Sequence, residues 1–246
     1  KKIFATLVEE DLTASGALAA LGVCPNDAAS ATRSYEEVVS WVAFAMENLA
    51  MGDFSFPSDY MGFELPANPA QVACTHLLRQ GGGLAGLRAA IDVWYNATKK
   101  VPCYRIPPRF DADFYDGLWD RMWCQFLVPQ ETYFARRGWP NDMFPRVDIR
   151  WDDVDKHCSA TWGVTPDRYA IHRFFGATTE AEWRAKATRI VFSNGRLDPW
   201  SAGGVHDGGP DLPVVRIPSG AHHADLFFSH PDDPFDLTAA RARILA

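Results

Sequence analysis

The sequence predicts an α/β fold in which a long helical part precedes a shorter strand-rich part. Apolar residues recur at helical spacing through much of the first 176 residues. Two short apolar runs follow at 188–193 and 212–218, and a helical pattern at 236–245 closes the chain. We place the boundary near residues 178–183, which gives predicted domains 1–180 and 181–246.

The first well-marked helix is expected between residues 34 and 52. Ser34 and Glu37 have the spacing of a capping box, in which two polar side chains satisfy the free backbone N–H groups of a helix start. Gly52 ends the pattern. The apolar residues between them recur every three or four positions, as in a core-facing helix: Val38, Trp41, Val42, Ala45 and Leu49.

Two more helices are expected at 68–81 and 84–95. Asn68 before Pro69 is typical of a helix start, because proline at the first helical position loses no hydrogen bond. The glycines of 81–86 match Gly-x-Gly-x-x-Gly, which in dinucleotide sites follows a strand. A helical pattern precedes them here, so we interpret this segment as a connector between helices.

The strand-rich end places an acid and a histidine after successive strands. Turn residues Asn194 and Gly195 end the run 188–193, so Asp198 is expected on a loop just past a strand. The run 212–218 stops at a Ser-Gly pair, which puts His222 after the second strand. Strand, acid loop, strand, histidine loop and helix is the order in which an α/β-hydrolase ends, with the triad ordered Ser, Asp or Glu, His.

Asp198 and His222 therefore read as two members of a catalytic triad. The acid would orient the imidazole and stabilise its charged form, while the imidazole takes a proton from a serine hydroxyl. The 246 residues contain no Gly-x-Ser-x-Gly elbow, and the nearest serines, Ser201 and Ser219, lie on polar turns. The blander alternatives are that Asp198 only forms a turn before proline and that His222 is an ordinary loop histidine.

A metal site at His222, His223 and Asp225 is disfavoured. Adjacent histidines on a loop after a strand point in different directions, and no further ligand cluster accompanies them. We expect neither a metal nor another cofactor.

Several segments together resemble the Pro-Xaa carboxypeptidase family of serine peptidases, which includes a lysosomal prolyl carboxypeptidase and dipeptidyl peptidase II. The C-terminal motifs are Ser193-Asn-Gly-Arg-Leu-Asp-Pro-Trp200 and Gly220-Ala-His-His-Ala-Asp-Leu226. Upstream matches lie at 56–62, 65–69, 93–97, 119–124, 141–145 and 158–164 and span nearly the whole chain. The combination of these motifs is nearer to that of dipeptidyl peptidase II.

The resemblance implies the C-terminal part of an α/β-hydrolase with an inserted helical cap. It assigns the triad acid to Asp198 and the triad base to His222, and it places the serine elbow in a segment upstream of Lys1. Where the family usually has an arginine after Asp-Leu, this chain has Phe227. Where the family has two polar residues flanking the cysteine of its Trp-Asp-x-x-x-Cys motif, this chain has Met122 and Phe126. These departures concern substrate contacts rather than the catalytic pair.

Four residues are candidate substrate contacts. Trp200 offers a rigid aromatic face for a proline ring, or else is a core tryptophan. Asp142 is a candidate anchor for a peptide's amino terminus, with a structural role in the cap as the alternative. Met143 either lines the same cleft or fills the cap. His223 is expected to support His222 or to pack beside it.

The five cysteines form no Cys-x-x-Cys pair, and their wide spacing suits structural disulfides. The resemblance suggests Cys24 with Cys103 and Cys124 with Cys158, and leaves Cys74 to pair with an upstream segment. The alternative is a cytosolic protein with buried thiols. Asn96-Ala-Thr98 is a glycosylation sequon, compatible with secretion.

Composition indicates a folded protein with ample core material and no affinity for nucleic acid. Of 246 residues 47% are apolar and 22% charged, and the formal net charge is −7. No apolar run is long enough to suggest a membrane span. The family resemblance favours a lysosomal or secreted location, with a homodimer left open.

Three hypotheses of different kinds follow from this sequence. The first is a proline-specific serine exopeptidase whose nucleophile lies on another segment, releasing dipeptides or, alternatively, C-terminal residues. The second is an inactive fragment or peptide-binding module. The third is an unrelated lipase or esterase, which a preference for acyl esters would favour.

Overall fold

A computed structural model describes residues 15–107, 115–127, 150–175 and 180–246, so the predicted contacts Asp142 and Met143 lie outside the described residues. The chain divides into two compact units. One holds the described residues between Pro107 and Lys186, and the other those between Leu12 and Ile106 together with Ala187–Ala246. Much of the predicted cap thus packs with the C-terminal segment, and the division into domains 1–180 and 181–246 stays a prediction.

The helix predicted to start after Ser34 in the larger unit begins where its capping signals place it. Ser34 Oγ accepts a hydrogen bond from the Glu37 N–H (3.3 Å), and the Glu37 carboxylate accepts one from the Ser34 N–H (2.8 Å), so the capping box is confirmed. The helices are α2 (Ser15–Ala20), α3 (Ala28–Ala31), α4 (Tyr35–Met51), α5 (Pro69–Arg79) and α6 (Gly83–Tyr95).

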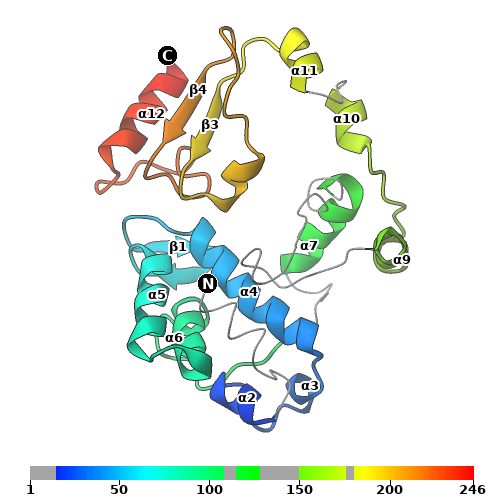
Figure 1. Cartoon of the computed structure of the whole chain (residues 1–246), viewed down its shortest axis with the longest axis vertical. Coiled ribbons are helices and arrows are strands. Elements are labelled where there is room, and N and C mark those ends of the chain that lie inside the picture. Colours follow the sequence, from blue (N-terminus) through cyan, green and yellow to red (C-terminus); the bar gives the residue numbers. More distant parts are fainter. Residues whose placement is uncertain (1–14, 108–114, 128–149, 176–179) are drawn as a thin grey trace. The chain divides into compact units, whose positions relative to one another are not determined.

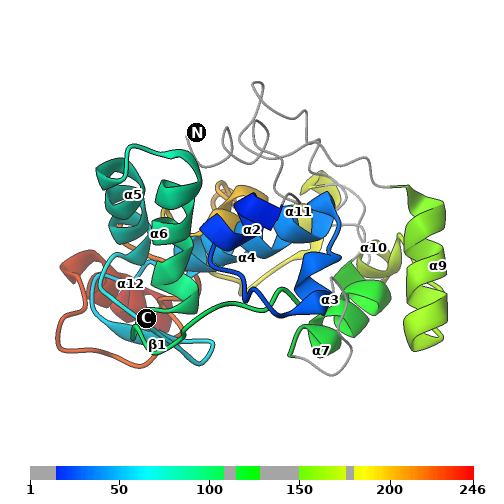
Figure 2. The same cartoon turned by 90° about the horizontal axis from the view of Figure 1, so that it is seen from below.

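The core of this unit lies where α4, α5 and α6 pack against one another. Figure 2 shows α5 and α6 side by side. Gly86 allows that approach, because a Cβ atom there would lie 2.9 Å from the Leu77 carbonyl oxygen. Of the glycine segment 81–86, which was predicted to connect two helices, Gly81 and Gly82 do so, whereas residues 83–86 form the first turn of α6. The largest fully buried side chains include Leu49, Leu87, Ile91 and Trp94, and burying an aliphatic side chain of this size contributes about 1.5–3 kcal/mol.

A hairpin between α4 and α5 was not predicted. Strands β1 (Ser58–Tyr60) and β2 (Phe63–Leu65) pair antiparallel. Met61 and Gly62 between them have φ values of 52° and 79°. Two left-handed residues are what a type I′ turn requires, so this local geometry closes the hairpin.

Two disulfides have the pairing that the family resemblance implied. Cys24 bonds Cys103 in the larger unit, and Cys124 bonds Cys158 in the smaller one. Cys74 on α5 is exposed and forms no disulfide among the described residues.

The predicted glycan acceptor Asn96 is 8% exposed. Its Nδ2 donates to the Val101 carbonyl (3.0 Å), and its Oδ1 accepts from the Val101 N–H (2.9 Å). A glycan would be attached to Nδ2, which here hydrogen-bonds to the protein. Glycosylation of Asn96 stays a prediction.

The C-terminal segment contains a parallel strand pair and a closing helix. Strand β3 (Phe192–Gly195) pairs with β4 (Val214–Ile217), and α12 (Phe235–Leu245) packs against β4 (Figure 1). The first strand begins and ends later than predicted. Gly195 belongs to the strand, opposite Ile217, rather than to a turn. A Cβ atom at Gly195 would lie 2.5 Å from the Gly220 carbonyl oxygen, so glycine permits this close backbone approach.

The smaller unit is helical and is built around a disulfide. Cys124 and Cys158 are fully buried and cluster with the buried Val154, and three partly buried tryptophans pack against this cluster: Trp123, Trp151 and Trp162. Its elements are α7 (Tyr115–Met122), the π-helical turn η1 (Trp123–Leu127), α9 (Trp151–Trp162), α10 (Ala170–Phe175) and α11 (Glu180–Lys186).

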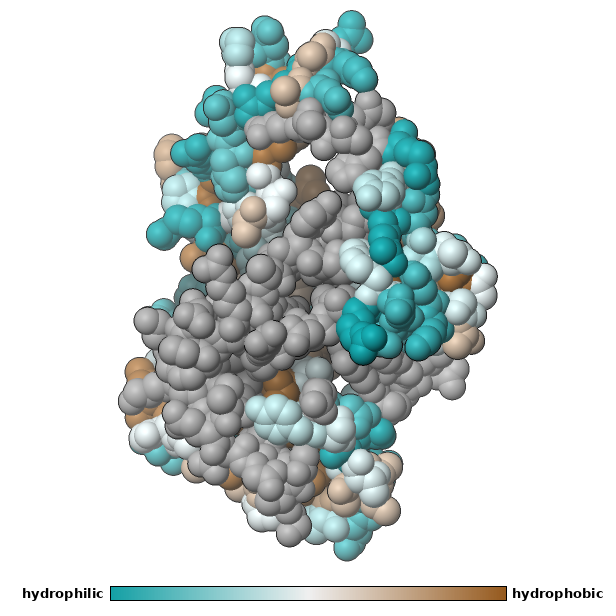
Figure 3. Space-filling model, turned by 45° about the vertical axis from the view of Figure 1, so that its right-hand side comes forward, coloured by the Kyte–Doolittle hydropathy of each residue, from teal (hydrophilic) through white to brown (hydrophobic). Residues whose placement is uncertain are grey.

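The described surface is mainly polar on the face shown in Figure 3, with hydrophobic side chains in small scattered patches. None of the helices in the described ranges combines the length and the apolar character needed to cross a membrane.

Candidate active site

The loop after β3 holds Asp198 in a fixed orientation. Asp198 precedes the short 3₁₀ helix η2 (Pro199–Gly203), and its Oδ1 accepts a hydrogen bond from the Trp200 N–H at 2.9 Å. The Leu197 N–H donates to the Gly220 carbonyl at 2.9 Å. Asp198 therefore does form the turn that the bland alternative proposed, and the same loop is tied to the histidine loop.

The structure brings Asp198 and His222 together. His222 Nδ1 lies 2.9 Å from Asp198 Oδ2 and 3.0 Å from Oδ1, and the two side chains are only 16% and 12% exposed. Because a carboxylate accepts hydrogen bonds, the tautomer that fits this contact carries its hydrogen on Nδ1 and donates a hydrogen bond to Asp198. Nε2 is then left as the basic nitrogen that can take a proton from a nucleophile.

The end of helix α4 fixes the backbone of the histidine. The His222 N–H donates to the Met51 carbonyl at 3.1 Å. Met51 is the last residue of α4, where carbonyls lack a partner within the helix. The contact satisfies one of these carbonyls and brings the negative end of the helix dipole to the backbone of His222.

His223 stacks on His222, with ring centroids 3.7 Å apart. Its φ of 54° lies in the left-handed region, which costs a non-glycine residue of order 1 kcal/mol. Burial lowers the pKa of His223, as does the charge of His222, while Asp198 and Asp225 oppose this shift. The neutral form of His223 is therefore favoured, and its ring packs on that of His222.

Trp200 also lies near His222. Its ring centroid is 6.2 Å from that of His222, and its Nε1 donates to Met51 Sδ at 3.2 Å. The side chain is 39% exposed, so it is not a core tryptophan and an open part of its surface lies near the histidine.

Helix α12 anchors the histidine loop through two polar side chains. The Asp236 carboxylate accepts hydrogen bonds from the Ser219 N–H (2.8 Å) and hydroxyl (2.7 Å). Arg241 donates to the carbonyls of Ala224 (2.7 Å) and Asp225 (3.3 Å) and pairs with Asp233. The loop is thus held immediately before and after the two histidines.

Sequence reasoning missed Met51, Asp236 and Arg241 as supports of the site. Acidic Asp236 at the start of a helix and basic Arg241 within it are ordinary helix residues. Nothing near Met51 in the sequence indicates that its carbonyl meets the C-terminal loop. Their roles depend on contacts between distant segments, which no local pattern encodes.

One group of potential metal ligands comes together among the described residues. Asp120, Cys124 and His157 have ligand atoms within 4.8 Å of one another. The Cys124 sulfur is bonded to Cys158, however, and Asp120 accepts hydrogen bonds from His157 Nε2 (2.8 Å) and Trp162 Nε1 (2.6 Å). These atoms already have protein partners, so the group reads as part of the core of the smaller unit.

Comparison with known proteins finds matches to the segment that contains the candidate site and to most of the rest of the chain. The family model for serine carboxypeptidase S28 matches residues 147–244, which include Asp198 and His222. The chain is 31% identical over 216 residues to human lysosomal Pro-X carboxypeptidase, and 29% identical over 206 residues to the mouse protein of that name. It is also 29% identical over 220 residues to prolyl carboxy peptidase like protein 5 of Caenorhabditis elegans.

These matches cover most of this chain but less than half of each relative. The human alignment spans 86% of this chain and 42% of the relative, the mouse alignment 82% and 40%, and the nematode alignment 82% and 42%. The range matched by the family model contains the motifs around Asp198 and His222. The chain therefore belongs to the serine carboxypeptidase S28 family, the Pro-Xaa carboxypeptidases.

Proposed function

We propose that this chain forms the acid-and-base part of a proline-specific serine exopeptidase. The observation that carries the proposal is the short contact between His222 Nδ1 and the Asp198 carboxylate, with both side chains largely buried. A serine on a segment outside these 246 residues supplies the nucleophile, and His222 Nε2 accepts its proton. The resulting imidazolium stays beside Asp198 and returns the proton to the leaving amine.

The fold that goes with this proposal is an α/β-hydrolase with a helical cap. The parallel pair β3–β4, the two loops after these strands and helix α12 support it, because they reproduce the order in which such folds end. In this reading residues 1–180 are most of the cap and 181–246 complete the hydrolase domain. The segment that carries the serine is the chain's main partner, and the exposed Cys74 is a candidate for a disulfide to it.

The substrate in this proposal is a peptide with proline before the scissile bond. Trp200 is partly exposed, its ring centroid lies 6.2 Å from that of His222, and a pyrrolidine ring packs well on an indole. Release of the residue after proline is favoured because three relatives are called carboxypeptidases. Dipeptide release remains the second candidate, favoured by the upstream motifs nearer to dipeptidyl peptidase II. Lysosomal location follows the names of the human and mouse relatives.

The test is a matched set of prolyl substrates presented to the full-length protein. A peptide with a blocked amino end and free carboxylate, a peptide with the opposite arrangement, and one with both ends blocked separate the two exopeptidase types. We expect hydrolysis of the first, with the activity lost when its carboxylate is amidated. Hydrolysis of the second alone would favour dipeptide release, and faster hydrolysis of acyl esters than of any peptide would overturn the peptidase proposal.

A further inference from the structure

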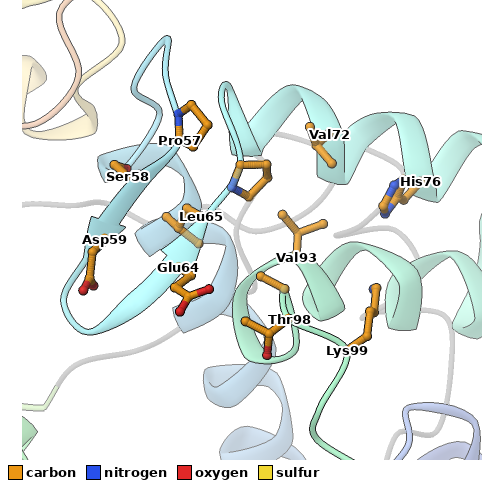
Figure 4. Close-up of a pocket in the computed structure, with 12 residues that line it drawn as sticks. Pro57, Ser58, Asp59, Glu64, Leu65, Val72, His76, Val93, Thr98 and Lys99 are labelled. Atoms are coloured by element: carbon orange, nitrogen blue, oxygen red, sulfur yellow. The ribbon is translucent and has the colours of Figure 1, made fainter. Parts of the chain in front are cut away.

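A cavity that shares no residue with the candidate active site lies between the β1–β2 hairpin, helices α5 and α6 and the turn after α6. Its volume is about 540 Å³, within the range of small-molecule sites. Figure 4 shows side chains from all four of these segments around it. The three motif segments 56–62, 65–69 and 93–97 each contribute to its lining, and the proposed catalysis uses none of them.

One side of the cavity carries two carboxylates. Asp59 and Glu64 line it and are direct partners in the β1–β2 register, so their side chains leave the hairpin on the same face. Like charges directly opposite each other destabilise a strand pair. Neither carboxylate has an ion-pair partner within the described ranges. A cationic group bound here would relieve their repulsion.

The other side of the cavity carries a lysine from the turn after α6. Lys99 lines the cavity with its backbone at φ 59°, and its N–H donates to the Asn96 carbonyl. Across the described residues it too has no ion-pair partner. An ammonium group at this position can bind a carboxylate.

An apolar strip separates the two charged sides. Leu65 and Val93 are buried in the cavity wall, and Val72 of α5 lies beside them. Ser58 Oγ is buried at the hairpin and makes no hydrogen bond to any described residue. This oxygen has no surface that a ligand could reach, so the apolar residues form this part of the cavity wall.

We propose that this cavity binds a short zwitterionic peptide with apolar side chains. The peptide's ammonium group lies at Asp59 and Glu64, its carboxylate lies at Lys99, and its side chains cover Val72 and Val93. This site is independent of the proposed peptidase activity, since it shares no residue with the Asp198–His222 pair.

The test is calorimetric titration of the full-length protein with the dipeptide Val-Leu, which lacks the proline of the proposed substrates. We expect saturable binding. The variants Glu64→Gln and Lys99→Gln each weaken it at least about tenfold, because each removes one charged contact. N-acetyl-Val-Leu-amide, with both charges blocked, gives no saturable binding.

Two variants serve as controls, and unfolding temperatures confirm that all variants are folded. Lys100→Gln removes a neighbouring exposed lysine that does not line the cavity, so wild-type affinity is expected. His222→Ala is expected to bind the dipeptide as wild type does. Loss of dipeptide binding in this variant would assign the peptide to the candidate active site instead. Absence of saturable binding to wild type, unchanged affinity in Lys99→Gln, or equal binding of the blocked peptide would each overturn the proposal.

Discussion

The helices of residues 15–106 and the C-terminal segment 187–246 belong to the same compact unit but are held by different interactions. The helices share a continuous apolar core with Leu49, Leu87 and Ile91 fully buried. The C-terminal segment has one short strand pair, and its loops are fixed by Asp236 and Arg241. Apolar burial is non-directional and supplies stability, whereas hydrogen bonds are directional and set the orientation of His222.

The largest expected effect is a fall in kcat that leaves the stability of the protein nearly unchanged. Asp198→Asn keeps the size of the side chain but presents an amide to His222, so the imidazole loses the partner that fixes its tautomer. We expect kcat on the cleaved prolyl peptide to fall about 10⁴-fold, with a change in unfolding temperature of no more than a few degrees. Asp211→Asn, an exposed matched control, should retain full activity. A loss of less than tenfold in Asp198→Asn would contradict the assignment of the triad acid.

The next effect tests the polar anchors. Arg241→Gln leaves Asp233, whose side chain is 4% exposed, without its cationic partner. Removing one member of a buried pair costs about 3–5 kcal/mol, so the free energy of unfolding from urea titration should fall by that amount. Arg243→Gln on the exposed side of the same helix is the control. Equal losses in the two variants would mean that the Arg241 contacts do not hold the segment.

A substitution in the helical core should reduce stability without affecting the chemistry. Leu87→Ala removes a fully buried side chain from α6 and leaves a cavity, which costs about 3 kcal/mol. Well below the unfolding temperature, kcat should stay within about twofold of wild type, because no contact of His222 is altered. Leu78→Ala, at a position that is 59% exposed, should change stability by less than about 0.5 kcal/mol. A large fall in kcat for Leu87→Ala would contradict this separation of roles.

The smallest effect depends on pH. Burial raises the pKa of Asp236, but the hydrogen bonds from Ser219 outweigh it and leave the pKa below its ordinary value of 3.8. The folded state therefore prefers the ionised form, and this contribution is present at neutral pH and lost as the pH falls below that ordinary value through the lower folded pKa.

Asp236→Asn should accordingly cost about 1 kcal/mol at pH 7 and progressively less as the pH falls below 4. Urea unfolding at several pH values measures the difference. Asp232→Asn is the control, since its side chain is 74% exposed and its contact with His230 is long. A deficit that stays constant down to pH 3 would show that ionisation of Asp236 is not involved.

Local signals predicted the helices well and the strands less well. The capping box at Ser34 and the proline after Asn68 lie at the starts of α4 and α5. The first C-terminal strand was misplaced because Gly195 was interpreted as a turn residue, whereas the structure uses it for close approach to Gly220. The β1–β2 hairpin was missed because its turn pairs Met61 with Gly62, and methionine is not a usual residue for left-handed backbone.

The sequence by itself determined which residues are candidates for the site. Asp198 and His222 follow from turn residues, strand patterns and motif spacing, all of which act over a few neighbouring positions. Their catalytic roles stay predictions that the substitutions above test. The fold class is supported only at the level of an α/β chain with a parallel strand pair.

Only the tertiary structure decided how these residues are held. The carbonyl of Met51 meets the N–H of His222, and Asp236 meets Ser219, because the packing of α4 and α12 brings distant segments together. Packing of the β1–β2 hairpin beside α5 and α6 likewise creates the cavity lined by Asp59, Glu64 and Lys99. Local sequence patterns reflect backbone preferences within a turn or two. Contacts between distant segments depend on how the whole apolar core closes, which no short segment encodes.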